Sequence, residues 1–246
     1  MALNVEYKKV KSFLHENGIF FTNKNHFRLK DEDRLTFEKN LEIERGVGIL
    51  GGVSLPLRMG VGSYSWSALN NFTHIGRYCS IAIGLRILGP RHPIEALTSS
   101  SIMYDKHFSM VNFLESEYGY KHASNPNTQK PLSIVIGNDV WIGANVTLPR
   151  NIYIGDGAVI ASNSVITKDV MPYTIVGGNP AKVIKNRFEP EVVRRLLASR
   201  WWDYNLGELS SLNMNNPEAF LDRFNPVMLS KLKPQIITSD QLIAIE

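Results

Sequence analysis

Between Ile136 and Met171 the chain repeats a six-residue pattern six times without interruption. The hexads read IGNDVW, IGANVT, LPRNIY, IGDGAV, IASNSV and ITKDVM. An aliphatic residue opens each hexad, and a small or β-branched residue stands four places later. A period of six does not fit the 3.6-residue turn of a helix, whereas a short strand followed by a tight turn does. The pattern predicts a parallel β-helix in which three hexads close one triangular coil, so this block forms two coils.

A second block in the same frame, IGRYCS, IAIGLR and ILGPRH, runs from Ile75 to His92 and adds one coil. The hexad LNNFTH extends it backwards by one face, and less regular coils are expected from about Leu41. We therefore expect a mainly β fold, a β-helix of hexapeptide repeats with a long ejected loop, an N-terminal cap segment and C-terminal helices. The expected parts are 1–40 for the N-terminal helix and cap, 41–184 for the β-helix with the inserted loop 93–133, and 185–246 for the C-terminal helical extension.

Short helices are predicted on both sides of the β-helix. Residues 5–17 carry one apolar stripe and stop at Gly18, a typical helix C-terminus, and residues 19–40 are expected to form short strands and turns. Further helices are predicted from Pro190 and from Pro217, because proline is favoured at the first helical position and an acidic residue follows each. The stripes are Tyr7, Val10 and Leu14 in the first helix, and Val193, Leu196, Leu197 and Trp201 in the second.

Charge and cysteine content limit the classes of partner. A net charge of +4 without a long Lys/Arg run favours an anionic ligand over nucleic acid. The one cysteine, Cys79, falls on the inward position of its hexad, so we expect it in the core and not as a nucleophile.

The start MALNVEYKKVKSF lacks the apolar run of a signal peptide, and no stretch is long and apolar enough to span a bilayer. A cytoplasmic protein without an integral membrane segment is expected.

The segment between the two blocks breaks the repeat, and we expect it to leave the β-helix at a corner. Loops of this length are uncommon unless they serve as lids or binding surfaces. Rings with polar tips suit the faces and hydroxyls of sugars, but they would equally anchor the loop to its own coil or to a neighbouring subunit. The aromatic and histidine residues of the loop are Tyr104, His107, Phe108, Phe113, Tyr118, Tyr120 and His122.

The run VWIGANVTLPRNIYIGDGAVIASNSVITKDVMPYTIVGGNPAKVIKNRF resembles the hexapeptide-repeat acyltransferases, which fold as a left-handed β-helix. The run IGRYCSIAIG, the pair His92-Pro93 and the sequence WWDY narrow the resemblance to the branch of xenobiotic and surface-polysaccharide O-acetyltransferases. The resemblance extends from about Ile75 to Phe224. Only the resemblance implies the left-handed winding, because general chirality rules favour right-handed connections.

The resemblance implies a homotrimer in which acetyl-CoA, a co-substrate, lies between adjacent β-helices. It also implies direct transfer to a hydroxyl with one histidine as general base, which by position is His92. The chemistry requires such a base, because a hydroxyl is a poor nucleophile until its proton is taken. The oxyanion formed on the thioester carbonyl needs a fixed donor, and the backbone amide of Ala144 matches the family's donor.

Binding residues follow from the same register. Coenzyme A carries a diphosphate and a 3′-phosphate, so lysine side chains and free backbone amides are expected to line its binding site. The alternative for each lysine is a solvated surface residue. Trp141 could flank the pantetheine or pack between subunits, and the pair Trp201-Trp202 is expected to dock against the β-helix. The predicted cofactor-binding residues are Trp141, Ala144, Ser162, Thr167, Lys168, Lys182 and Lys185, and the predicted acceptor-binding residues are Tyr64, Trp66, Tyr104 and His107.

His74 precedes His92 by 18 residues, which is one full coil. The two side chains are therefore expected to stack at one corner of the β-helix at the strand spacing of about 5 Å. The alternative is that His74 is only a partly exposed corner residue.

Three functions compete. The favoured one is O-acetylation of a saccharide such as a capsule, lipopolysaccharide or other glycan precursor, because the approach LGPRHPIEALTSSS resembles polysaccharide modifiers. The second is acetylation of a drug hydroxyl of the chloramphenicol or streptogramin type, and the third is a non-enzymatic or metal-dependent β-helix. N-acetylation of an amino sugar is a more remote variant of the first. A metal-dependent β-helix would need three converging histidines, and the block from Ile136 to Met171 contains none, so no metal is expected.

Overall fold

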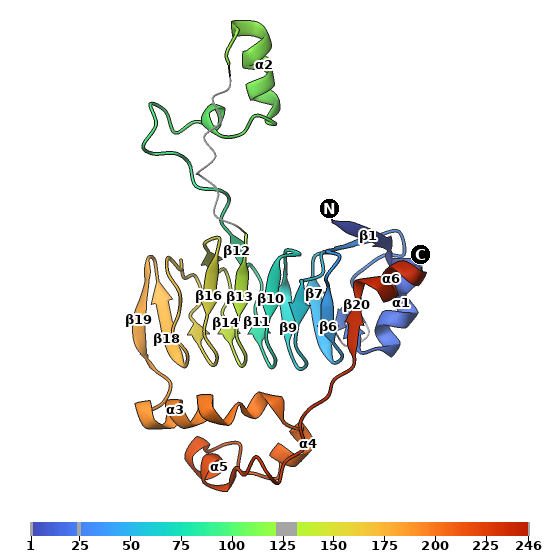
Figure 1. Ribbon diagram of the computed structural model, residues 1–246, viewed down its shortest axis with the longest axis vertical. Helices are drawn as coiled ribbons and strands as arrows, with labels where there is room; N and C mark the ends of the chain where they lie inside the picture. Colours follow the sequence, from blue (N-terminus) through green and yellow to red (C-terminus); the bar gives the residue numbers. More distant parts are fainter. Residues whose placement is uncertain (1, 24–25, 122–131, 246) are drawn as a thin grey trace.

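The protein is described by a computed structural model that covers residues 2–23, 26–121 and 132–245. Its body is a parallel β-helix whose coils are stacked side by side along one axis (Figure 1). Three sheets form the three faces of the coils, and a long insertion leaves the body at one corner. The predicted β-helix is therefore confirmed as a stack of parallel coils.

The strands fall into three groups. The first face consists of β6 (Glu42–Glu44), β8 (Arg58–Met59), β10 (Thr73–Ile75), β13 (Ile134–Ile136) and β16 (Ile152–Ile154), with β20 (Ile236–Thr238) antiparallel at its edge. The second face consists of β2 (Ile19–Phe20), β7 (Val47–Gly51), β9 (Tyr64–Ala68), β11 (Ser80–Ile81), β14 (Trp141–Ile142), β17 (Val159–Ile160), β18 (Thr174–Gly178) and the antiparallel β19 (Ala181–Asn186). The third face consists of β12 (Arg86–Ile87) and β15 (Thr147–Leu148).

The two repeated positions of each hexad point into the coil. Their side chains are between 0% and 4% exposed, which explains why the sequence repeats there and varies elsewhere. Cys79 is fully buried in the same core, and burial raises the pKa of its thiol to about 12, as expected for a core residue. The inward residues are Ile136, Ile142, Leu148, Ile154, Ile160 and Ile166 at the first position, and Val140, Val146, Ile152, Ala158, Ser164 and Val170 at the second.

A left-handed residue recurs at the turns with the same period of six. Asp139, Asn145, Asn151, Gly157 and Asn163 have φ values of 55°, 58°, 55°, 69° and 61°. Asn, Asp and Gly tolerate this conformation far better than other residues, so the hexads place them where the chain turns between faces. At Gly157 a Cβ atom would come within 2.4 Å of the Tyr173 ring, so the turn also requires a glycine for space.

The N-terminal segment lies on the open edge of the first coil, where the cap was predicted. Strand β2 pairs with β7 on the second face, and Thr36 bridges to Ser54 on the third. The C-terminal β20 covers the first face by pairing with β6, so both ends of the chain meet at this edge (Figure 1). The remaining elements here are β1 (Leu3–Glu6), paired with β5 (Arg34–Phe37), α1 (Tyr7–Glu16), β3 (Thr22–Asn23), paired with β4 (His26–Phe27), and α6 (Ser239–Ile245).

The C-terminal helices run along the body on the side opposite the insertion (Figure 1). They are α3 (Pro190–Ser199), α4 (Leu206–Leu209) and α5 (Pro217–Arg223), and they share a second hydrophobic core with Tyr173. The predicted starts at Pro190 and Pro217 are confirmed. Trp201 lies beyond the end of α3, in a 3₁₀ helix that follows the left-handed Arg200, so the predicted stripe was one turn too long. Its ring stacks on Tyr78 at 5.2 Å, as the docking prediction requires.

The predicted stacking of His74 on His92 is wrong. His74 pairs with Arg58 on one side and with Val135 on the other. The chain leaves the β-helix after β12, so the residue that returns at the stacked position is Val135, after the insertion. His74 is a half-buried surface residue, and its pKa is lowered by burial and then by the Arg58 guanidinium.

Candidate functional site

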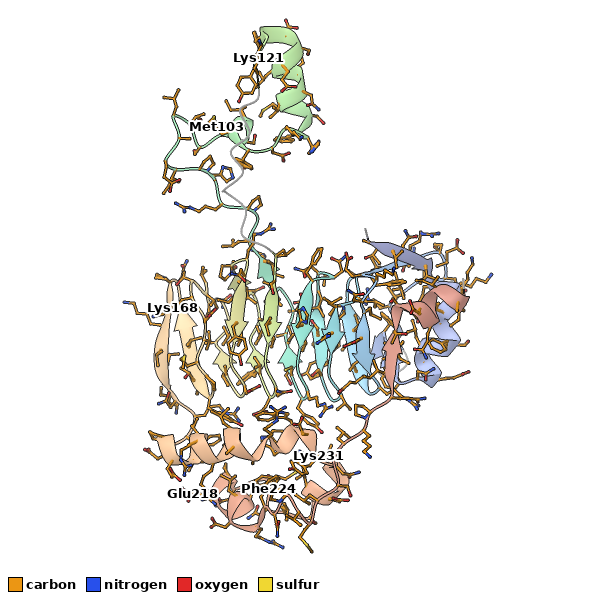
Figure 2. The ribbon with its side chains drawn as sticks, viewed as in Figure 1. Met103, Lys121, Lys168, Glu218, Phe224 and Lys231 are labelled. Atoms are coloured by element: carbon orange, nitrogen blue, oxygen red, sulfur yellow. The ribbon has the colours of Figure 1, made fainter. Side chains whose placement is uncertain are left out.

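His92 lies in the ejected segment, which we call the arm and define as residues 88–121. The arm contains a 3₁₀ helix at Ser101–Met103 and the helix α2 (Ser109–Tyr118), with Val111 as its fully buried apolar residue. It projects well beyond the coils, and the labelled Met103 and Lys121 both lie far outside them (Figure 2). The loop predicted to leave the repeat is thus an extended structure with its own local fold.

Both ring nitrogens of His92 have partners within the arm. Nδ1 lies 2.7 Å from the backbone oxygen of Ser99, which can only accept, so Nδ1 carries the proton. Nε2 lies 3.0 Å from the hydroxyl of Tyr104, which then donates to it. The two rings also meet edge to face at 5.1 Å. This arrangement leaves the Nε2 lone pair directed at a hydroxyl proton, which is the arrangement a general base needs.

The Tyr104 backbone is fixed by the turn that precedes it. Its amide donates to the Ser101 oxygen at 3.1 Å, and the hydroxyl of Tyr120 donates to the Ile102 oxygen at 2.7 Å. Ser99 and the hydrogen bond from Tyr104 to His92 were missed by the sequence analysis. The run of serines before Tyr104 indicates a turn but does not reveal which atoms face the imidazole.

The predicted acceptor residues do not all come together. His107 is exposed, and its amide donates to Asp105 at 3.1 Å. Tyr64 and Trp66 lie on the outward side of β9, on the body and not on the arm. His122 lies outside the residues that the structure describes.

Tyr64 instead lies with predicted cofactor residues on the second face. In register across the strands, Tyr64 neighbours Ser80, Ser80 neighbours Trp141, and the row continues through Val159 and Ile175 to Lys185. Tyr64 and Trp141 are 38% and 58% exposed, so two aromatic side chains are presented on an outward surface. Alternation along the strands places these side chains outward while their neighbours fill the coil.

Ala144 and Ser162 occupy equivalent turns of adjacent coils. The Ala144 amide donates to the Ser162 hydroxyl at 3.1 Å, so the predicted oxyanion donor already has a partner in this structure. The Ser162 hydroxyl is exposed and can rotate, so an incoming carbonyl oxygen can replace it as the acceptor.

The predicted basic residues lie at the far end of the body. Lys182 and Lys185 are on the edge strand β19, opposite Gly177 and Ile175 of β18. Thr167 and Lys168 line a pocket of about 260 Å³ at the open end of the last coil, and the Lys168 side chain extends away from the body (Figure 2). Of the predicted cofactor residues, Trp141, Lys182 and Lys185 therefore lie on strands of the second face. The others, Ala144, Ser162, Thr167 and Lys168, lie in segments between strands.

In 2–23, 26–121 and 132–245, no three His, Cys, Asp or Glu side chains converge closely enough to hold a metal ion. Within the same residues, no helix has the length and apolar character needed to cross a bilayer.

Three comparisons with known proteins bear on the identity of the chain. The model of the bacterial transferase hexapeptide (six repeats) matches residues 133–168. A protein of Lysinibacillus sphaericus named as a probable macrolide acetyltransferase is 38% identical over 153 residues, which cover 60% of this chain and 79% of that protein. A chloramphenicol acetyltransferase of Klebsiella aerogenes is 40% identical over 137 residues, covering 56% of this chain and 62% of that enzyme.

A third relative acts in a different context. A candidate lipopolysaccharide biosynthesis O-acetyl transferase of Escherichia coli K12 is 30% identical over 126 residues, covering 48% of this chain and 56% of that protein. The chain thus spans about three fifths of the length of two of these three relatives and most of the first. The repeat, the coils and these similarities together identify an enzyme: the chain belongs to the hexapeptide-repeat acetyltransferases, in the branch that includes xenobiotic and surface-polysaccharide O-acetyltransferases.

Proposed function

We propose that this protein is an acetyl-CoA-dependent O-acetyltransferase that modifies a hydroxyl of a saccharide. The observation that carries this proposal is the orientation of His92, whose Nδ1 is held by the Ser99 oxygen while Nε2 faces a hydroxyl. A hydroxyl acceptor that takes the place of the Tyr104 hydroxyl delivers its proton to Nε2.

In the proposed reaction, Nε2 removes the hydroxyl proton as the acceptor oxygen attacks the thioester carbonyl of acetyl-CoA. The charge that develops on the carbonyl oxygen is stabilised by the Ala144 amide, which exchanges the Ser162 hydroxyl for this oxygen. The tetrahedral intermediate collapses with cleavage of the C–S bond. The proton held by Nε2 then passes to the sulfur of coenzyme A, which restores His92 to its starting state.

The proposed assembly is a homotrimer of left-handed β-helices with the active site between subunits. Within one chain, the described residues place no hydrogen bond or ring contact between His92 or Tyr104 and the second face. Apolar side chains more than half exposed are present on both surfaces, where they are available to pack against a neighbouring subunit. On the arm these are Ile94, Leu97, Phe113 and Tyr118, and on the body Ile83, Trp141 and Ile184.

The cofactor is proposed to lie along the second face. Trp141, Ser162 and Thr167 are assigned to the pantetheine side, and Lys168, Lys182 and Lys185 to the phosphates. The assignment is supported by the position of Trp141, Lys182 and Lys185 on one sheet, and by the pocket that Thr167 and Lys168 line together with β19. Coenzyme A carries several negative charges, and exposed lysine ammonium groups are suitable partners for them.

The choice of a saccharide over a drug depends on the arm. Tyr104 and His107 are assigned to the acceptor, with Tyr64 and Trp66 contributed from the body, and this aromatic and polar lining suits a sugar ring. We also propose that the chain divides into parts 1–40, 41–184 and 185–246. The reaction is proposed to use no metal, and the protein is proposed to be cytoplasmic. The specific observation that favours the alternative, a xenobiotic acetyltransferase, is the 38–40% identity to enzymes named for macrolide and chloramphenicol.

The experiment that separates these functions is acetyl-CoA-dependent release of free thiol with a panel of acceptors. The panel contains neutral hexoses, N-acetylated hexosamines, sialic acid and its polymers, chloramphenicol and a streptogramin. We expect thiol release with a sugar and with neither drug. Release with a drug at a comparable or higher rate would instead make the chain a xenobiotic acetyltransferase.

A further inference from the structure

The hydroxyl of Tyr104 occupies the position that the acceptor hydroxyl must take. In the structure it is hydrogen-bonded to His92 Nε2 at 3.0 Å, and among the described residues this is its hydrogen-bond partner. The Nε2 atom has one lone pair, so it cannot accept from Tyr104 and from an acceptor hydroxyl with full strength at once. Binding of an acceptor must therefore break the bond between Tyr104 and His92.

Tyr104 is positioned beside His92 by two contacts. Its backbone is held in the turn by the Ser101 oxygen, and its ring packs edge to face against His92. A rotation of the side chain frees Nε2 while the hydroxyl stays beside the imidazole, where it can donate to a second group of the bound acceptor. When a bound acceptor covers this hydroxyl from water, an acceptor that offers it an oxygen is favoured over one that leaves it without a partner, so the site is selective for such a ligand.

We propose that Tyr104 is a specificity residue that donates to a second hydroxyl of the acceptor, so that the site selects vicinal diols. One hydroxyl of the pair donates to His92 Nε2 and is acetylated, and its neighbour accepts from Tyr104. Adjacent hydroxyls on a sugar ring lie about 2.8 Å apart, which matches a site whose two polar atoms are at hydrogen-bond distance. This inference rests on the proposed function, because it takes His92 as the base.

The test compares a diol acceptor with its deoxy analogues. The probes are the methyl hexopyranoside that is acetylated fastest and the two analogues that lack the hydroxyl on either side of the acetylated one. For wild-type enzyme we expect kcat/KM to fall on the order of ten-fold with at least one analogue, mainly through KM. In Tyr104→Phe this preference should shrink to within about two-fold, because the analogue no longer leaves a hydroxyl unpaired.

Tyr153→Phe is the matched control, since it removes a tyrosine hydroxyl from the first face and should retain the wild-type preference. A Tyr104→Phe enzyme that keeps the wild-type preference would overturn the role of Tyr104. The inference would also be overturned by a wild-type enzyme whose kcat/KM is the same with the deoxy analogues as with the full acceptor. Turnover only with acceptors that carry an isolated hydroxyl would overturn it as well.

His92→Ala distinguishes this failure from failure of the proposed function. If His92→Ala loses turnover while Tyr104→Phe keeps the preference, only the diol inference is wrong. If His92→Ala retains wild-type turnover, the base itself is wrongly assigned and both proposals are overturned.

Discussion

At the scale of the residue, the proposed function depends on one imidazole, that of His92, whose two nitrogens have different partners. His92→Ala removes the proposed base, so turnover should fall by about 10²- to 10⁴-fold while acetyl-CoA binding stays nearly intact. Steady-state kinetics and calorimetric titration of acetyl-CoA measure the two quantities. His15→Ala serves as a control, because His15 is an exposed histidine in α1 at the cap. Equal loss of turnover in both variants would remove His92 from the mechanism.

At the scale of the element, the first coil depends on strands from both ends of the chain. In the C-terminal element α6, Leu242 is fully buried, whereas its neighbour Ile243 is 44% exposed. Leu242→Ala should therefore cost about 2–5 kcal/mol of unfolding free energy through transfer and cavity terms. At about 2–4 °C per kcal/mol, the midpoint of thermal unfolding should fall on the order of 10 °C. Ile243→Ala should change the midpoint by only a fraction of this amount. Equal midpoints for both variants in scanning calorimetry would show that α6 does not stabilise the cap.

At the scale of the whole molecule, the arm and the second face of one chain are separate, so a shared site predicts complementation between inactive subunits. His92→Ala chains and Lys182→Ala/Lys185→Ala chains should each be poorly active at low acetyl-CoA. The loss caused by the lysine substitutions should depend on salt more strongly than the loss at His92, because salt screens the attraction that these lysines supply in the wild-type chain. The two variant chains are denatured together and refolded in equal amounts. In a randomly mixed trimer, each site takes its arm from one chain and its second face from the next, and each part is intact in half of the cases. About a quarter of the sites therefore combine an intact arm with an intact face. Activity at that level is expected, with each variant refolded alone as the control. Mixed samples that stay at the mean of the two variants would place the site within one chain.

The β-helix itself follows from the sequence, because each inward position faces the same environment in every coil. The same apolar residue types therefore recur at Ile142 and Ile160, and the left-handed turn at Asn145 and Asn163 adds the same local constraint. A repeat of this kind can be recognised from neighbouring residues in the sequence, without knowing where distant parts of the chain lie. The helices at Pro190 and Pro217 were predictable for the same reason, since their start signals are local.

Only the tertiary structure decided the features that depend on long-range contacts. The spacing of 18 residues predicted that His92 stacks on His74. The arm interrupts the coil between them, so Val135 is the residue that lies beside His74. No local signal in the last residues indicates that β20 returns to pair with β6. The partners of the His92 ring depend on how the turn from Ser99 to Tyr104 folds around it. The sequence by itself therefore determined the repeating body and, through its family resemblance, pointed to His92 as the candidate base. The atoms that contact the His92 ring lie in non-repeating segments, so only the tertiary structure decided those contacts, because they follow no period in the sequence.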